Sequence, residues 1–299
     1  GRPLEQPSLV RARYVDAAPP TEAPLIVTAP LPGSEVTEQS TTVTGTTVPG
    51  ASVSVAAANL DTGATTVLAA TADQTGAFAV TATLDNGVTA LTTTVTAGGA
   101  TGYDQRTVFR DAVSGTLLLD VIDPIGDDNG PGTFAYPTSA DFKAGAFDLE
   151  RFQVFDTGDD VVLRARIRNL DPTFGVTNGA QMLDVYVREP GATPVSTAAA
   201  FPQRNYTIHS DSAWTQRVEV QGFAPVVWMR ADGTAVAGGT FVANPLSRYI
   251  TVRLPKAELG TPGPGWVFTV VLTGQDGFSP DQARGFAPTP QQFLFGVCP

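Results

Sequence analysis

The chain has 299 residues, of which 42% are hydrophobic, so it is a globular protein long enough for two domains. Its 29 acidic and 18 basic residues give a net charge of −11, which disfavours nucleic acid and anionic lipid as partners. No apolar run reaches the roughly 18 residues of a membrane-spanning helix, so the sequence predicts no membrane span.

Residues 1–24 fit neither of the domains predicted after them. They open with "GRPLEQPSLVRARYVD", without an initiator methionine or a signal-peptide pattern, and end in the proline-rich "AAPPTEAP". Proline-rich segments of this kind are typical of stiff, extended linkers. We expect residues 1–24 to be the tail of a preceding segment, followed by a linker.

Short β-rich runs alternate with turn signals across residues 25–112. Runs such as "SVSV" and "AFAVTATL" alternate with a period of two, and the turn signals recur at the spacing of roughly 8–12 residues typical of an all-β sandwich. The pair Asn86-Gly87 is the strongest hairpin signal. The sequence therefore predicts a β-sandwich of about seven strands here.

Residues 113–299 also read as strands and turns, with at most a short helical turn at 254–260. In "DVVLRARIRNL" the alternation places Val161, Leu163, Ala165 and Ile167 on one face of a strand. The arginines at 164, 166 and 168 fall on the opposite face, which predicts a solvated sheet surface. The whole chain is therefore predicted to be all-β, with two β-sandwich domains.

One acidic stretch, "DPIGDDNGPGTFAYP" at residues 123–137, favours a metal site. A Ca²⁺ ion takes six to eight oxygen ligands, and Asp123, Asp127 and Asp128 offer carboxylates beside a glycine-rich backbone. The spacing is not that of an EF-hand. Asp148 would complete the site if its strand runs alongside. The alternative is an exposed acidic turn, because Asp, Asn and Gly favour turns in any case.

Catalysis by this stretch is rejected, because aspartates on a wet loop lack the apolar burial that makes a general acid. His209 has no nucleophile motif such as G-x-S-x-G near it, and we interpret it as structural. Cys298 is the only cysteine, which excludes an internal disulfide, and no basic residue stands near it to lower its pKa.

Flat aromatic rings are the groups on which neutral sugars stack. Trp228 and Trp266 lie in apolar runs and are predicted to be core residues. Trp214 stands between polar stretches and is the first candidate for stacking, followed by Tyr206 and Tyr136.

Several stretches in order resemble the C-terminal module of bacterial glucodextranase, which also occurs in amylopullulanases. They are "DPIGDDNGPGTFAYPT", "GAFDLERFQVFDTGDDVVLRARIRNL", "QMLDVYVREPG", "GWVFTVVLTGQDGFSPDQAR" and "FLFG". The module's β-sandwich is similar to family 9 carbohydrate-binding modules. Residues 25–112 resemble the immunoglobulin-like domain that precedes this module, and the opening resembles the last stretch of a family 15 glycoside hydrolase domain.

The resemblance implies a non-catalytic accessory region of an extracellular α-glucan hydrolase. Such a region would bind a polysaccharide, either an α-glucan or a cell-wall glycan, or attach the enzyme to the cell surface. It also strengthens the prediction of bound Ca²⁺, and the partners it implies are an upstream catalytic domain or a cell-surface protein. The alternative is a structural spacer or docking module in a surface-layer assembly.

Overall fold

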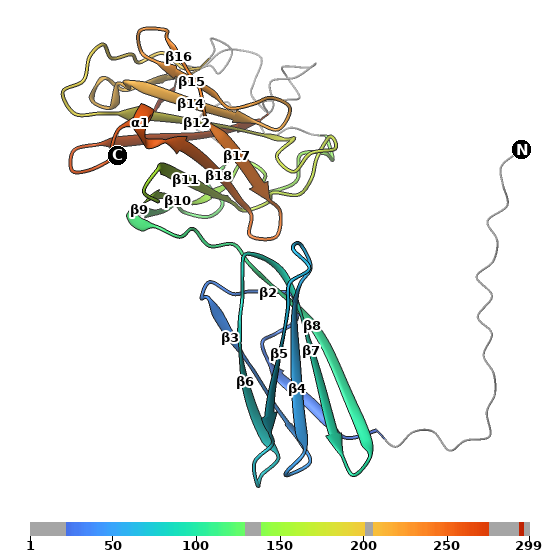
Figure 1. Ribbon diagram of the computed structural model, residues 1–299. Helices are drawn as coiled ribbons and strands as arrows, with labels where there is room; N and C mark the ends of the chain where they lie inside the picture. Colours follow the sequence, from blue (N-terminus) through green and yellow to red (C-terminus); the bar gives the residue numbers. More distant parts are fainter. Residues whose placement is uncertain (1–21, 129–138, 201–205, 275–292, 296–299) are drawn as a thin grey trace, which may run out of the picture. The chain divides into compact units, whose positions relative to one another are not determined.

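The computed structural model describes residues 22–128, 139–200, 206–274 and 293–295. The chain divides into two compact units, residues 1–111 and 112–299, and most of their strands are labelled in Figure 1. Strands make up 54% of the structure and helix 3%, which confirms the all-β prediction. Within the described ranges, no helix is long and apolar enough to cross a bilayer.

The first unit contains two sheets. The smaller sheet is made, in spatial order, of β1 (Leu25–Ala29), β3 (Ser40–Thr47) and β6 (Ala77–Thr83). The larger sheet has the order β2 (Ser34–Glu35), β8 (Ala100–Arg110), β7 (Gly87–Ala97), β4 (Ser52–Asn59) and β5 (Thr65–Thr71). Strand β2 pairs in parallel with β8, and the other pairs are antiparallel.

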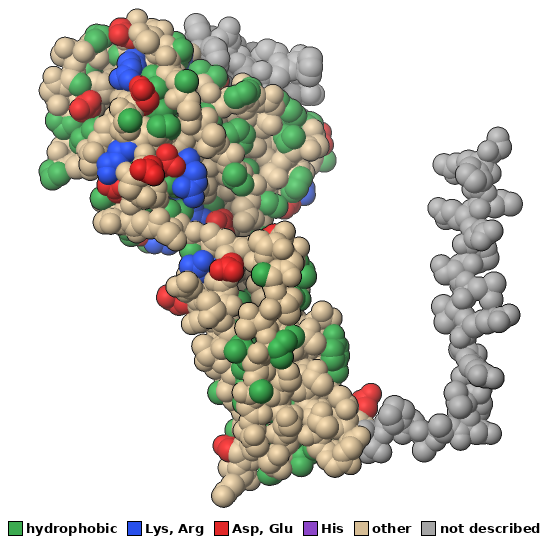
Figure 2. Space-filling view, in the orientation of Figure 1, with side chains coloured by type: hydrophobic (Ala, Val, Ile, Leu, Met, Phe, Trp, Pro, Cys, Tyr) green, Lys and Arg blue, Asp and Glu red, His purple; other side chains and the backbone are tan. Residues whose placement is uncertain are grey.

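Period-two alternation builds the core of the first unit. Val53 and Val55 of β4 are fully buried, and they join Phe78 and Val80 of β6 in one hydrophobic cluster. The intervening residues are mainly serine, threonine and alanine, and the face in Figure 2 carries few charged side chains on this unit.

The hairpin predicted at Asn86-Gly87 is wrong. These residues connect β6 to β7, and the two strands belong to different sheets. Gly87 has a φ of 109°, the positive value expected of a turn glycine. Here the turn belongs to a connection that crosses from one sheet to the other. A tight two-residue hairpin lies instead at Gly98-Gly99, between β7 and β8, with φ values of 57° and 83°.

The second unit also contains two large sheets. One has the order β17 (Thr240–Asn244), β18 (Tyr249–Pro255), β11 (Asp160–Ile167), β10 (Leu149–Asp156) and β9 (Thr116–Ile122). The other has the order β16 (Ala235–Val236), β15 (Val227–Arg230), β14 (Gln216–Gln221), β12 (Gln181–Arg188) and β19 (Val267–Gly274). A parallel pair, β13 (Tyr206–Ile208) with β20 (Phe293–Phe295), the 3₁₀ turn η2 (Ser210–Ser212) and α1 (Lys256–Leu259) complete the unit.

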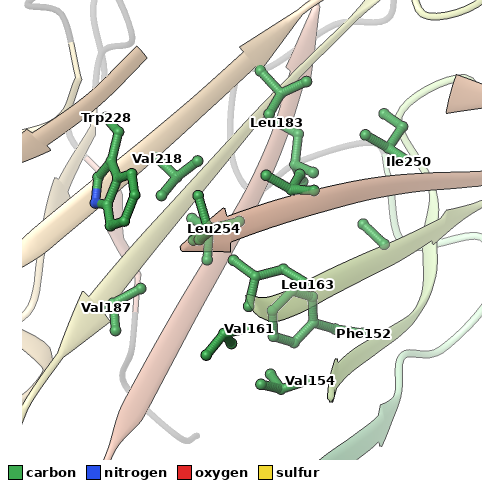
Figure 3. Packing of buried hydrophobic residues seen from close by; sticks show 14 of the residues in the cluster. Phe152, Val154, Val161, Leu163, Leu183, Val187, Val218, Trp228, Ile250 and Leu254 are labelled. Carbon is green, nitrogen blue, oxygen red and sulfur yellow. The ribbon is translucent and has the colours of Figure 1, made fainter. Parts of the chain in front are cut away.

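The inner faces of these two sheets form one hydrophobic core. Figure 3 shows Phe152, Val154 and Leu163 of one sheet facing the side of Val218 and Trp228 of the other, within a single buried cluster. The predicted inward row of β11 (residues 161, 163, 165 and 167) lies in this cluster, which confirms that part of the reading.

The opposite face of β11 is less exposed than predicted. Arg164 is only 4% exposed, and its guanidinium lies 3.7 Å from the centroid of the Tyr249 ring. Its Nε donates a hydrogen bond to Thr251 Oγ1 at 3.2 Å. Arg164 therefore packs along the sheet against an aromatic face, as arginine stems and planar guanidinium groups allow.

Candidate functional site

The candidate site lies where the chain leaves β9 and later enters β10. The two strands are antiparallel, with Ile122 opposite Arg151, and the amide of Asp123 donates to the carbonyl of Glu150 at 3.0 Å. This pairing brings Asp148, just before β10, beside the acidic loop (residues 123–128). The condition on which the sequence made Asp148 a fourth member of the site is therefore met.

Asp148 joins the acidic loop to the end of β11. Its side chain is fully buried, and its Oδ2 accepts hydrogen bonds from the Gly126 amide at 2.8 Å and from Arg168 Nη1 at 3.1 Å. The carbonyl of Asp148 accepts from the Arg168 amide at 2.8 Å. Its Oδ1 is buried and has no hydrogen-bond partner among the described residues. A buried carboxylate oxygen of this kind calls for a ligand, because such groups are nearly always satisfied.

The carboxylates around this oxygen repel one another. Burial, with smaller contributions from the negative charges of Asp127 and Asp148, raises the pKa of Asp123 to about 6. Asp127 is exposed and Asp128 is partly exposed. Within the described ranges, no three His, Cys, Asp or Glu side chains are placed closely enough to hold a metal ion. Residues 129–138, which include Tyr136, lie outside the described ranges.

Arginines surround the acidic loop and reduce its net charge. Glu150 forms ion pairs with Arg248 at 3.1 Å and with Arg166 at 3.4 Å, while Arg168 pairs with Asp148. Gly145 allows Arg168 this position, because a Cβ at residue 145 would lie 2.9 Å from its Cδ. These ion pairs place positive charge beside the acidic loop, on the side of Asp148 and Glu150.

Trp214 is not placed for stacking on a sugar. Only 5% of this residue is exposed, its Nε1 donates to the Ala198 carbonyl at 2.8 Å, and its ring packs against Tyr186 with centroids 5.9 Å apart. The expectation for Trp214 is therefore corrected: it is a core residue of a small cluster that also includes Ile208 and Val271.

The other aromatic and histidine predictions have mixed outcomes. Trp228 is 1% exposed, which confirms it as a core residue, and Trp266 packs against the same core. Tyr206 lies in β13, but its side chain is outside the described part of the structure. The Nδ1 of His209 accepts a hydrogen bond from the Asp211 amide at 3.2 Å at the start of η2, which is a local structural role.

Three exposed aromatic residues, Tyr103, Phe174 and Phe223, were not among the sequence candidates. Phe174 lies in the loop between β11 and β12, is 50% exposed, and has a φ of 53°. The sequence "TFGV" contained a weak indication of a turn at Phe174, because Phe-Gly occupies a two-residue turn in which Asn-Gly is usual.

Comparisons with known proteins give one family match and a set of solved structures. A search of curated proteins finds no match. Among solved structures, an engineered protein shares 21% identity over 32% of this chain and 21% of its own, with a TM-score of 0.27. Bacteroides uniformis beta-glucuronidase 3 shares 9% identity over 86% of this chain and 25% of its own, with a TM-score of 0.26. This chain thus spans about a fifth to a quarter of those two proteins.

A third structure, a tetra-tandem repeat from the extending region of a large adhesion protein, shares 11% identity over 85% of this chain and 70% of its own, with a TM-score of 0.26. TM-scores this low support no functional inference. A family model, in contrast, matches residues 118–299 and describes the C-terminal, SLH-like binding module of glucodextranase. That match covers more than half of the sequence and nearly all of the second unit, and the chain belongs to this family of glucodextranase C-terminal binding modules.

Proposed function

We propose that this chain is a non-catalytic accessory region of an extracellular α-glucan hydrolase, and that its second unit binds carbohydrate. The observation that carries the proposal is the family match over residues 118–299 to a binding module of glucodextranase. The two sheets and continuous core of that unit provide a rigid scaffold on which loops can present ligand-binding side chains.

The carboxylates of the acidic loop are poor candidates for glycosidic cleavage. A glycosidase needs a general acid and a second carboxyl that both reach a bound sugar. Asp148 has no exposed side-chain surface, and Arg168 holds it as an ion pair. A binding role therefore fits this site better than a catalytic one.

We also propose that the acidic loop binds Ca²⁺. Asp148 Oδ1, buried and without a described partner, would be the anchor, and Asp123 and Asp127 would be further carboxylate ligands. Because no three such side chains among the described residues are close enough to hold an ion as they stand, the ion would have to draw the loop in around itself. Asp128, beside them in the same loop, is a fourth candidate. A bound cation would neutralise the repulsion among these side chains, and its role would be to stiffen the loops at this end of the unit.

The test of the carbohydrate proposal is calorimetry and affinity electrophoresis of the 299-residue chain against dextran, soluble starch and isolated cell wall. Binding to dextran or starch supports an α-glucan module. Binding to cell wall alone supports surface attachment, which the SLH-like description of the family favours as the second candidate. Binding to none of them would leave a structural spacer and would contradict the proposal.

A further inference from the structure

The turn that carries Phe174 has an unfavourable residue at its first central position. Thr173 and Val176 exchange backbone hydrogen bonds at 2.9 and 3.2 Å around Phe174-Gly175. Both central residues have positive φ, 53° for Phe174 and 87° for Gly175, which is the pattern of a type I′ turn. A bulky side chain seldom adopts this conformation, whereas Asn does so readily.

Burial does not compensate for that conformational cost. Phe174 remains 50% exposed, although the ring has an aromatic support: the Phe142 ring packs edge-on against it, with centroids 5.8 Å apart at 71°. Phe142 itself is 8% exposed and contacts Phe147, with centroids 6.0 Å apart. The turn therefore presents a ring that is held rigidly from beneath and open to solvent.

An ion pair links the segments that carry the two rings: Lys143 directly follows Phe142, and Asp171 precedes Phe174 in its loop. Asp171, three residues earlier in the same loop, forms an ion pair with Lys143 at 2.7 Å, and both side chains are about half exposed. The Asn169 side chain accepts a hydrogen bond from the Asp171 amide at 3.1 Å, which fixes the start of the loop. Because the charges of Asp171 and Lys143 cancel, this surface offers carboxylate acceptors and ammonium donors without a net charge.

We propose that Phe174, supported by Phe142 and with the Lys143–Asp171 ion pair linking their segments, is the carbohydrate-binding platform of the second unit, and that it takes a glucosyl residue of a neutral glucan. The C–H face of a pyranose packs on an exposed aromatic ring, and paired charged side chains bind its hydroxyl groups. An acidic glycan would be repelled by a chain of net charge −11. The inference rests on the proposed carbohydrate-binding function and names its site.

The variant Phe174→Asn separates ligand binding from folding. It removes the ring and places at the turn the residue that a type I′ turn prefers, so the melting temperature stays equal or rises. Phe174→Trp keeps a stacking face. Phe223→Asn is the matched control, because Phe223 is 52% exposed in the same unit, in the connection between β14 and β15.

The experiment is calorimetric titration of the four full-length proteins with isomaltotriose and dextran. We expect Phe174→Asn to weaken binding by about tenfold or more, with Phe174→Trp and Phe223→Asn within about threefold of the wild type. Unchanged binding by Phe174→Asn, or an equal loss in Phe223→Asn, would overturn this inference and leave the proposed function standing. A wild-type chain that binds neither glucan would overturn this inference, and one that also binds neither starch nor cell wall would overturn the proposed function as well.

Discussion

Replacing Asp148 by Asn tests the calcium proposal at its anchor. The variant keeps one oxygen for the Gly126 amide, but it loses the ion pair with Arg168 and places an NH₂ group where the buried Oδ1 lies. Arg168 is 48% exposed, so the lost pair is largely screened, and the unsatisfied donor is the main cost. Relief of repulsion with Asp123 offsets part of it. We expect a loss of about 1–2 kcal/mol in EDTA, or about 2–6 °C in melting temperature for a unit of this size.

Added calcium should increase the difference in unfolding stability between the wild type and Asp148→Asn. At about 100 times its dissociation constant, a bound ion stabilises the wild type by about 2.7 kcal/mol, and most of this gain should be absent in Asp148→Asn. All three tryptophans lie in the second unit, so fluorescence follows its unfolding alone. Glu258→Gln is the control, because this exposed carboxylate pairs only with the surface group of Arg230 in the described contacts. A full calcium response in Asp148→Asn, or none in the wild type, would refute the reasoning.

Three further predictions concern stability. Arg151 lowers the pKa of Asp120 through a hydrogen bond of 2.6 Å, so this pair stabilises the fold fully above about pH 4, and its contribution is lost as the pH falls through the lowered pKa of Asp120. Asp120→Asn should therefore cost about 0.5–1 kcal/mol at pH 7, and the cost should shrink as the pH falls below about 4, by urea unfolding. Gly145→Ala should cost about 1–2 kcal/mol or more, because residue 145 has a φ of 80° and its Cβ would meet Arg168, and thermal melting measures the loss. Trp214→Ala should cost about 3–5 kcal/mol by denaturant unfolding followed by circular dichroism; a loss below about 1 kcal/mol would contradict its core role.

The strands and the core rows were predictable from the sequence, because their physical signal is local. A period of two in "DVVLRARI" is sufficient to place Val161 and Leu163 on a buried face, whatever the partner strands are. The family was also recognisable, since several motifs occur in order across residues 118–299. The sequence made the proximity of Asp148 to the acidic loop conditional on its strand running alongside, and the structure pairs β9 with β10 in antiparallel fashion.

The structure alone decided which side chains remain open to a ligand. Trp214 has polar neighbours in sequence, yet residues from β12, β13 and β19 enclose it. Asn86-Gly87 has the dihedral freedom of a hairpin turn, but the partners of β6 and β7 lie in different sheets. Phe174 stands in a Phe-Gly pair whose turn could be suspected from the sequence, but only the structure shows that this turn leaves its side chain exposed. Exposure depends on segments far apart in the chain, whereas alternation and turn preference depend on neighbours. The sequence by itself therefore determined the strands, and the tertiary structure determined which side chains are exposed.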